Sequence, residues 1–412
     1  MELLHPRCAG IDIGKKFAVV TIRVAGSRRR KTQYSTMRYL SSTPSVLALR
    51  DDLVAAKVTC AVMESTGEYW KPFFYGLEGA GFAQILANAR AVKNMPGKKS
   101  DVSDSRWLAD LGAYGLVQPS FVPPPPVREL RDLNRDRTAL LRLKAKLLMR
   151  VQDVLEDAGI KLAVVASDIN GVSSRAILQA MIAGERDPFA LADLARGRLR
   201  AKRAELSDAL TGRFTEHHAF RIQQLLADID HLQVSADAYT ERIDHALGPY
   251  RTFRDQLCTI PGISTLTADI ITAETGADMS VFPSAKHLCS WAGVSPGSNE
   301  SAGVTHPVST GHGNKHLKAA LGVAAMAISH SNNNYLSARH HRIAARRGRL
   351  RALVATEHKV LEIIWHMGST GAPYHDLGGD YFTRRDPAKA TRRAINQLRS
   401  LGYDITLTPA VS

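Results

Sequence analysis

The chain has few cysteines and few aromatic residues. Its four cysteines (Cys8, Cys60, Cys258 and Cys289) are scattered over 412 residues and form no CxxC pair. This argues against a zinc knuckle or a disulfide framework and is typical of a protein in a reducing cytosol. Aromatic residues make up only 6% of the chain, so stacking of single-stranded bases is not expected to dominate any binding to nucleic acid.

Long hydrophobic runs are also missing. No segment is apolar over the length needed to cross a bilayer, although 44% of the residues are hydrophobic. The first seven residues lack the apolar core of a secretory signal peptide. We therefore expect a cytoplasmic protein with no membrane partner.

Charge is the strongest compositional signal. The sequence holds 54 Lys and Arg against 39 Asp and Glu, which gives a net charge of +15 and a pI near 9.8. Binding of a polyanion with release of counterions is the usual physical reason for such an excess. The alternative is a basic surface that serves solubility only. The first reading predicts contacts with backbone phosphates.

The first third of the chain alternates between strand and helix patterns. Three consecutive strands are predicted first, and helices and strands then alternate up to residue 114. This order is that of a ribonuclease-H-like α/β domain. The predicted strands are 9–13, 17–24, 33–39, 58–63 and 82–87, and the predicted helices are 43–56, 70–79 and 100–114.

The remainder reads as mainly helical. The run Pro123–Pro126 is a stiff break, and 127–159 and 188–248 are charged helical stretches that favour an intramolecular hairpin over a coiled coil between subunits. A helix, a Pro-Gly turn and a second helix at 257–276 form a candidate helix-hairpin-helix. We expect an N-terminal α/β core, a coiled-coil-like helical region, a C-terminal helical domain and a tail, at 1–122, 123–250, 251–379 and 380–412.

Carboxylates recur in this first third. Asp12 lies between Ile11 and Ile13 in AGIDIGKK, where a carboxylate on a covered strand requires a partner or a cation. Glu64 ends a later strand, and Asp101 and Asp104 share one face of a helix. Oxygen ligands suit Mg²⁺ or Mn²⁺, and paired ions can align a phosphodiester for in-line displacement. The alternatives are helix caps for the two aspartates and a plain surface carboxylate for Glu64.

The loop 294–313 offers several hydroxyl groups ahead of a helix that begins near Lys315. A hydroxyl beside a base and an anion-binding helix terminus is suited to nucleophilic attack. A polar surface loop is the alternative, and the residues alone do not choose among Ser295, Ser298, Ser301, Ser309 and Thr310. The basic residues expected to contact nucleic acid are Lys98, Lys99, Lys315, Arg342, Arg346 and Arg347.

Three groups of motifs resemble the IS110-family transposases. The family's DEDD blocks are similar to GIDIGKK, MESTGEYW and KSDVSDSRWLA. Its second conserved block is similar to WAGVSPGSNESAG with GHGNKHLKAAL, and its C-terminal segment is similar to PYHDLGGDYFTRRD. The sequence departs from the family in VTHPVSTG, where basic residues are common. A sugar-kinase or actin-like ATPase also starts with a GIDIG-type strand, but its later phosphate and adenosine motifs are not found.

The resemblance implies a fold and a chemistry. The N-terminal domain would be RuvC-like, Asp12, Glu64, Asp101 and Asp104 would hold Mg²⁺ or Mn²⁺, and Ser301, with Ser298 as runner-up, would form a covalent link to DNA. The implied partners are donor and target DNA, a structured guide (bridge) RNA and further copies of the chain in a dimer or tetramer at the bacterial nucleoid.

Two other functions remain as alternatives. One is a RuvC-like Holliday-junction nuclease that hydrolyses DNA without a covalent intermediate. The other is a non-catalytic nucleic-acid-binding protein. The acidic residues argue against the latter, because carboxylates repel phosphate unless a cation intervenes.

Overall fold

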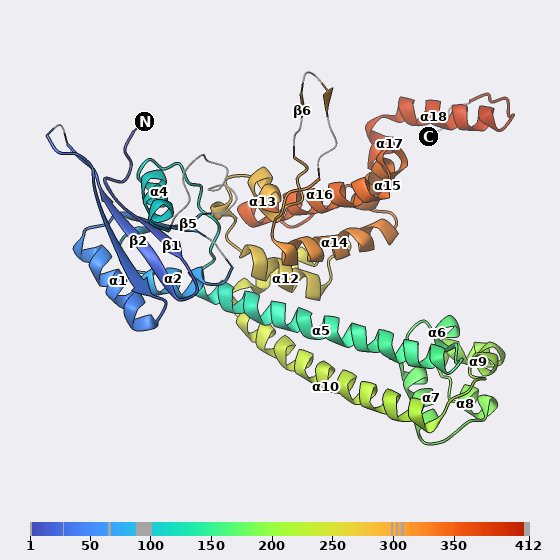
Figure 1. Ribbon diagram of the computed structural model, residues 1–412. Helices are drawn as coiled ribbons and strands as arrows, with labels where there is room; N and C mark the ends of the chain where they lie inside the picture. The colour runs from blue at the N-terminus through green and yellow to red at the C-terminus, as the bar shows by residue number, and fades with distance from the viewer. Residues whose placement is uncertain are drawn as a thin grey trace. The chain divides into compact units, whose positions relative to one another are not determined.

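A computed structural model describes residues 2–27, 29–64, 67–87, 101–297, 300–301, 304–305 and 309–407, with backbone only at Asp101, Glu300, Ser301, Val304 and Thr305. The chain forms two compact units, Met1–Pro123 and Pro124–Ser412 (Figure 1). Among the helices in these ranges, none has both the length and the apolar character that a bilayer crossing requires.

The first unit is built on a mixed five-stranded sheet in the order β3-β2-β1-β4-β5. β1, β2 and β3 form an antiparallel meander, whereas β4 and β5 run parallel to β1. The strands are β1 (Arg7–Ile13), β2 (Phe17–Val24), β3 (Gln33–Leu40), β4 (Cys60–Glu64) and β5 (Ala83–Ala87).

Helices cover both faces of this sheet. α1 (Thr43–Ala55) and α2 (Trp70–Leu77) pack on one face against Ile11, Ile13 and Met63. α4 (Asp101–Ala113) packs on the other face against Cys8 and Val62 (Figure 1). Because side chains alternate along a strand, the even-numbered residues of β1 and β4 face α4.

Two glycines allow α4 to approach the sheet closely. A Cβ at Gly10 would lie 2.0 Å from the Ser105 carbonyl oxygen, and a Cβ at Gly112 would lie 2.7 Å from the Cys8 sulfur. Residue numbers along α4 therefore rise as those along β1 fall. The helix runs antiparallel to the strand and begins at the strand's carboxyl end.

Polar contacts between α4 and the meander add to this packing. The hydroxyls of Thr21 and Ser105 are 2.7 Å apart, and Arg23 Nε donates to Asp110 at 2.8 Å. The Tyr34 hydroxyl donates to the same Asp110 oxygen. These contacts fix α4 along the sheet as well as above it.

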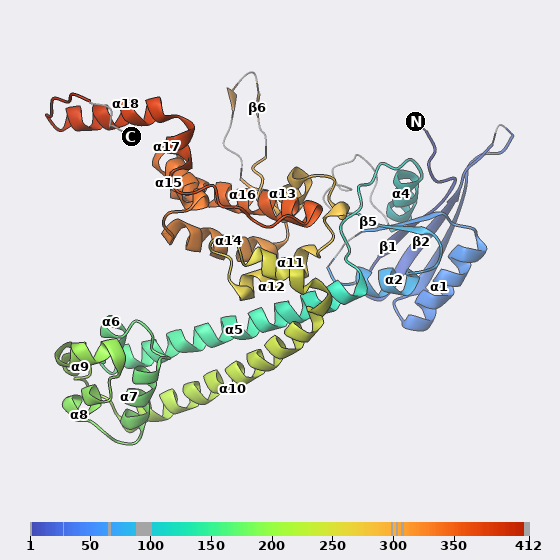
Figure 2. The same ribbon diagram turned by 180° about the vertical axis from the view of Figure 1, so that it is seen from behind.

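The second unit begins with a long helical hairpin. α5 (Pro125–Asp157) and α10 (Glu216–Ala246) pack side by side within the chain (Figure 2). The expected intramolecular hairpin is confirmed. The stretch 188–248, which was predicted to be helical, contains several separate helices, because Leu206 and Leu210 are buried in an apical core where the chain turns repeatedly. This apex contains α6 (Leu162–Val165), α7 (Val172–Ile182), α8 (Pro188–Asp193), η1 (Gly197–Lys202) and α9 (Arg203–Ala209).

Short helices make up the rest of this unit. The predicted helix–turn–helix is present, and Gly262 in its turn lies against Ala324 and Ile328. Ser264 caps the second helix with its own side chain, so the described contacts are those of a packing unit. The elements are η2 (Gly248–Tyr250), α11 (Arg251–Leu257), α12 (Thr265–Thr275), η3 (Met279–Val281), α13 (Ala285–Ala292), β6 (Glu300–Ser301), β7 (Val304–Thr305), α14 (Lys315–His330), α15 (Tyr335–Arg347), α16 (Arg349–Thr370), α17 (Tyr381–Arg385) and α18 (Pro387–Ser400).

The fold class expected from the sequence is confirmed. The N-terminal third is an α/β sheet domain with the predicted element order, and the remainder is mainly helical. Five of the ten strand ends differ from those predicted, by one or two residues, as is usual for ends that fray.

Gly10→Ala tests the close packing of α4 on β1. The new methyl group would clash with backbone atoms of Ser105 and Ala109, and overpacking of this kind costs about 3 kcal/mol. We expect hydrogen exchange of β1 and α4 amides to accelerate on the order of a hundredfold, measured by mass spectrometry.

Gly14→Ala is the matched control in the same segment. Its Cβ would meet only the Phe17 carbonyl oxygen, at 3.2 Å, so exchange in α4 should stay close to that of the parent chain. Equal exchange rates in the two variants would contradict the close approach of α4 to β1.

Candidate functional site

Asp12 and Glu64 occupy neighbouring positions at one edge of the sheet. β1 and β4 are parallel, and their register pairs Ile11 with Met63, so the next step along both strands places Asp12 beside Glu64. Both residues are even-numbered and half-buried, on the face that α4 covers. The carboxyl ends of adjacent parallel strands are a common location for functional groups in α/β domains.

α4 brings the backbone positions of the other two predicted residues to the same edge. Asp101 is its first residue and Asp104 lies in its first turn, at the end of the helix that lies over the carboxyl end of β1. Asp104 is half-buried. The three elements therefore converge on one corner of the sheet. We name this corner, formed by Asp12, Glu64, Asp101 and Asp104, the acidic edge.

The acidic edge offers only oxygen ligands, which suits a hard divalent cation such as Mg²⁺ or Mn²⁺. The described side chains do not include a group of three or more His, Cys, Asp or Glu arranged to hold a metal ion. The donor chemistry and the positions on the backbone thus fit such an ion, while the side chains of Asp12, Glu64 and Asp104 are not gathered into a three-ligand group.

Ser301 lies in a short β-hairpin of the second unit. β6 and β7 pair Glu300 with Thr305 and Ser301 with Val304, so Ser301 directly precedes the two-residue connection. Pro296 and Thr310 form a bridge nearer the base of this hairpin. We call the described residues of the segment 296–310 the serine hairpin. Its predicted runner-up, Ser298, lies outside the described residues.

Close backbone contacts define the base of the serine hairpin. Gly293 ends α13 in the left-handed conformation, with φ 74°. A Cβ on Gly313 would lie 2.2–2.3 Å from backbone atoms of Ala292 and Gly293, so the two arms approach at a distance that only glycine permits. Beyond the base, Lys318 Nζ of α14 donates to Thr310 Oγ1 at 2.7 Å.

Asn314 connects the same base to a buried carboxylate. Its side-chain oxygen accepts hydrogen bonds from the His316 and Leu317 amides and so caps α14. Its side-chain nitrogen donates to Glu274 Oε2 at 2.6 Å. The asparagine thereby joins the start of α14 to the end of α12.

Arginines of α5 complete this contact. Arg135 donates to both oxygens of Glu274 at 2.8 Å, in the bidentate geometry that gives the strongest charge-assisted hydrogen bonds. Arg131 donates to the last carbonyls of α12, at Ala273 and Glu274, which lack partners within the helix. We name Arg131, Arg135, Glu274 and Asn314 the Glu274 network.

Burial alone would raise the pKa of the Glu274 carboxyl, which is 1% exposed. The hydrogen bond from Arg135 and the charges of Arg131 and Arg135 outweigh burial and lower this pKa below its ordinary value. Glu274 is therefore ionised at neutral pH. A buried charge that loses one partner costs several kcal/mol (about 3–5), which makes the Glu274 network a strong structural constraint.

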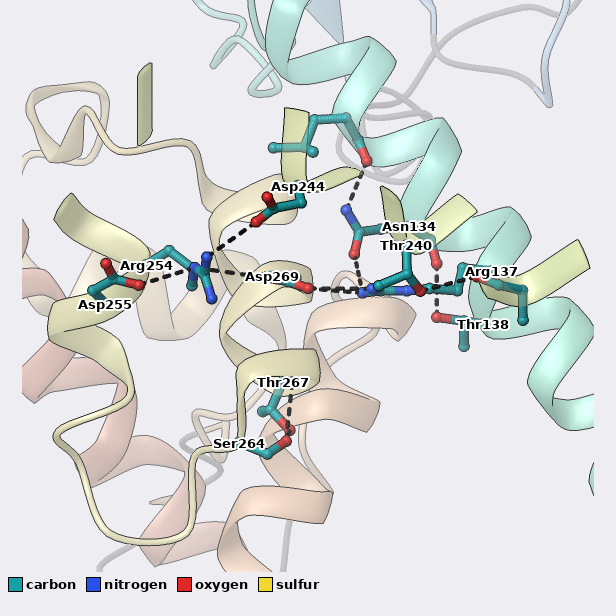
Figure 3. A network of polar contacts seen from close by, with 12 residues as sticks. Asn134, Arg137, Thr138, Thr240, Asp244, Arg254, Asp255, Ser264, Thr267 and Asp269 are labelled. Atoms are coloured by element: carbon teal, nitrogen blue, oxygen red, sulfur yellow. Dashed lines mark hydrogen bonds and ion pairs between the residues drawn. The ribbon is translucent and has the colours of Figure 1, made fainter. Parts of the chain in front are cut away.

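A second buried ion pair lies earlier in α12, at Asp269. Arg137 of α5, which is 2% exposed, donates to Asp269 of α12 at 3.1 Å and to Asn134 at 2.8 Å (Figure 3). Burial raises the pKa of Asp269, and the Arg137 charge opposes this shift. Arg254 Nε lies 3.9 Å from the other Asp269 oxygen. Two ionic contacts thus fasten α12 to α5.

Several predicted nucleic-acid contacts lie on the surface of the second unit. Lys315 is the first residue of α14 and is exposed. Arg342, Arg346 and Arg347 are exposed on α15, where Arg342 also stacks over Phe382. Lys98 and Lys99 lie outside the described residues.

Sequence reasoning missed Glu274, Asn314 and the arginines of α5. One signal was available: Asp269 and Glu274 are the only charged residues in the helix TLTADIITAET. Buried carboxylates require cationic partners, and RELRDLNRDR upstream contains arginines at helical spacing. The pairing itself joins residues more than 130 positions apart, which spacing does not reveal.

Asn314→Asp tests the Glu274 network. Aspartate retains a capping oxygen for α14 but places a second carboxylate against Glu274. We expect the unfolding free energy of the second unit to fall by about 3 kcal/mol and hydrogen exchange to accelerate over 311–320. Denaturant unfolding and exchange mass spectrometry measure the two effects.

Asn314→Ser is the matched control, because serine also caps helices but adds no charge. It should cost about 1–2 kcal/mol less than Asn314→Asp. If the two substitutions have the same effect, repulsion from Glu274 is absent and the network does not control the start of α14.

Comparisons with known families agree with this arrangement. The profile of the IS110 DEDD domain, described as a transposase, matches residues 9–160. The profile of the transposase IS116/IS110/IS902 family matches residues 254–341. No curated protein sequence gives a match. The first match includes the acidic edge and the second includes the serine hairpin, and the chain therefore belongs to the IS110 family of transposases, enzymes that cut and rejoin DNA.

Proposed function

We propose that this transposase cuts DNA with Ser301 as the nucleophile and the acidic edge as a divalent-cation site. The observation that carries the proposal is the position of Ser301 next to the connection of a short hairpin whose base is fixed by the Glu274 network. A nucleophile placed in this way can enter a DNA groove while its supporting elements stay packed. Under this proposal, residues of both matched family regions take part in one reaction.

The chemical step conserves the number of phosphoester bonds. The Ser301 hydroxyl oxygen attacks a DNA phosphorus, a new P–Oγ bond forms, and the bond from phosphorus to the 3′ oxygen breaks. The serine proton passes to a base and the leaving oxygen takes up a proton, so a 5′-phosphoserine link and a free 3′ hydroxyl result. Attack by a second DNA 3′ hydroxyl reverses the step and rejoins DNA without any external energy source.

The acidic edge supports this step through a cation. Asp12, Glu64, Asp101 and Asp104 would hold Mg²⁺ or Mn²⁺, which when bound polarises the phosphate and neutralises charge on the leaving oxygen. Serine is a weak nucleophile at neutral pH, so its reaction depends on that assistance. Within the chain, the four carboxylates otherwise repel phosphate.

The partners that we propose are those that the resemblance to the family implies. DNA is the substrate, and a structured guide RNA would specify donor and target DNA by base pairing. The acidic edge and Ser301 belong to separate compact units, so both reach one phosphate when the units are brought together within one chain or between copies in a dimer or tetramer. We also propose a serine-bearing domain at 251–379 and a tail at 380–412.

A covalent-adduct assay tests the proposal. DNA carrying the end of the element is incubated with the chain and Mg²⁺, and the products are denatured. We expect protein-linked DNA from the parent chain and from Ser298→Ala, and none from Ser301→Ala or Asp12→Asn. Mass spectrometry should locate the phosphoester on Ser301.

Glu68→Gln is the control for removal of a carboxylate. Glu68 is exposed and pairs with Lys71 at the surface, so adduct yield should remain unchanged. Strand cleavage that persists in Ser301→Ala but is lost in Asp12→Asn would instead identify a hydrolytic junction nuclease.

A further inference from the structure

A buried carboxyl group on α16 lacks a hydrogen-bond partner. Glu357 is 8% exposed, and its Oε2 atom accepts no hydrogen bond within the part of the chain that the structure describes. The side chain faces α14, where a Cβ on Gly322 would lie 3.6 Å from Glu357 Oε1. The helices α14 and α16 pack against each other (Figure 1). Because an unpaired buried carboxyl group is costly, its presence there calls for an explanation.

Lys318 of α14 is the cation that acts on this carboxyl group. It lies one helical turn before Gly322 and therefore on the same side of α14. Burial raises the pKa of Glu357, and the charge of Lys318 opposes this shift. Among the described residues, however, the two side chains form no ion pair, because Lys318 Nζ donates to Thr310 Oγ1 at 2.7 Å instead. The ammonium group is thus bound to a hydroxyl while a buried carboxyl group nearby is left unpaired.

Thr310 lies at the end of the serine hairpin. It pairs with Pro296 in an isolated bridge that joins the two arms of the hairpin. The close backbone contact of Gly313 with the end of α13 follows shortly afterwards. The bond from Lys318 therefore holds the second arm, which returns from Ser301, to the side of α14.

The other titratable groups beside Glu357 are neutral at neutral pH. From α15, His340 contacts the residue before Glu357, and burial lowers the pKa of this histidine. From α13, the Cys289 thiol contacts the backbone carbonyl of the residue after Glu357, and burial raises its pKa to about 12. The helices α11 and η3 contact α16 farther along, at Gly368. Of the charged groups on the described helices around Glu357, Lys318 is therefore the one that acts on it.

We propose that Glu357 and Lys318 form a proton-linked pair that positions the serine hairpin. While the carboxyl group is protonated, Lys318 stays bound to Thr310 and holds the second arm. When the proton leaves for solvent, the buried carboxylate attracts the ammonium group, whose flexible stem lets it change acceptor, and the bond to Thr310 weakens. Both are positioning residues, because they act through Thr310. The inference deepens the proposed function and rests on it for the consequence at Ser301.

The direction of the pH dependence follows from burial. Because burial raises the pKa of Glu357, this carboxyl group ionises at a higher pH than an exposed glutamate does. The second arm is therefore held at low pH and released as the pH rises through the raised pKa. Between the ordinary and the raised pKa the folded chain binds more protons than the unfolded chain, so the unfolding free energy decreases with rising pH.

Hydrogen exchange of the full chain without DNA tests the inference. Exchange over 309–317 is measured by mass spectrometry from mildly acidic to mildly alkaline pH and corrected for intrinsic exchange rates. In the parent chain, protection should fall about fivefold as the pH rises, which is the equivalent of one hydrogen bond. Glu357→Gln mimics the protonated carboxyl group and should keep this protection at every pH. Lys318→Met should lack it at every pH, because no ammonium group holds Thr310.

Glu362→Gln is the matched control on the same helix. Glu362 pairs with His358 and Lys359, so the pH dependence over 309–317 should remain that of the parent chain. Glu357→Met also removes the charge and should behave as Glu357→Gln, so a folding defect in one variant does not decide the test. Exchange over α16 reports whether each variant is folded.

Two results would overturn the inference. One is a pH dependence, or a lack of it, that the parent chain shares with both Glu357 variants. The other is parent-like protection of Lys318→Met at low pH, because the lysine would then not hold the second arm. Loss of the pH dependence in the Glu357 variants, together with low protection of Lys318→Met at every pH, supports it. No DNA is involved, so failure of the serine chemistry in the covalent-adduct assay remains a separate result.

Discussion

The carboxylate of Glu274 is the constraint on which the second unit depends. It is buried, ionised and held by Arg135, with Arg131 and Asn314 as further partners. Two of its partners lie on α5, which begins the helical hairpin, and Asn314 caps the helix that follows the serine hairpin. Removal of Arg135 would take away the bidentate partner of a buried charge, which is costly in a dry environment. The network therefore makes the orientation of α14 a consequence of where α5 and α12 pack.

An analogous constraint shapes the first unit without using charge. Gly10 and Gly112 remove the side chains that would hold α4 away from the sheet. Because α4 runs antiparallel to β1, its first turn lies near the carboxyl ends of β1 and β4, where Asp12 and Glu64 are located. Packing in the middle of the helix thus determines where its acidic end lies. In both units, packing contacts remote from Asp12, Glu64 and Ser301 constrain the elements that carry these residues.

Local sequence patterns predicted most of the fold, but they did not predict contacts between residues far apart in the chain. Alternating apolar residues located β1 and β2, and the apolar stripe of α5 located its helix, because burial of one face imposes a period on the sequence. The backbone positions of Asp12, Glu64 and Asp104 near strand and helix ends were predictable, whereas their side chains form no three-ligand group among the described residues. Glu274 and Asn314 were missed because their roles depend on a partner far along the chain. The prediction oversimplified the apex of the hairpin, because its short helices share one core instead of one continuous apolar stripe.

The central claim is that the acidic edge and Ser301 act on the same phosphodiester. Sulfur substitution of a non-bridging oxygen at the scissile phosphate tests it most directly, with adduct formation compared in Mg²⁺ and Mn²⁺. Sulfur binds Mg²⁺ poorly and the softer Mn²⁺ better. The account predicts that one of the two sulfur diastereomers gives no Ser301 adduct in Mg²⁺, and that its adduct yield recovers in Mn²⁺. Equal adduct yields from the sulfur-substituted and natural DNA in Mg²⁺ would contradict it.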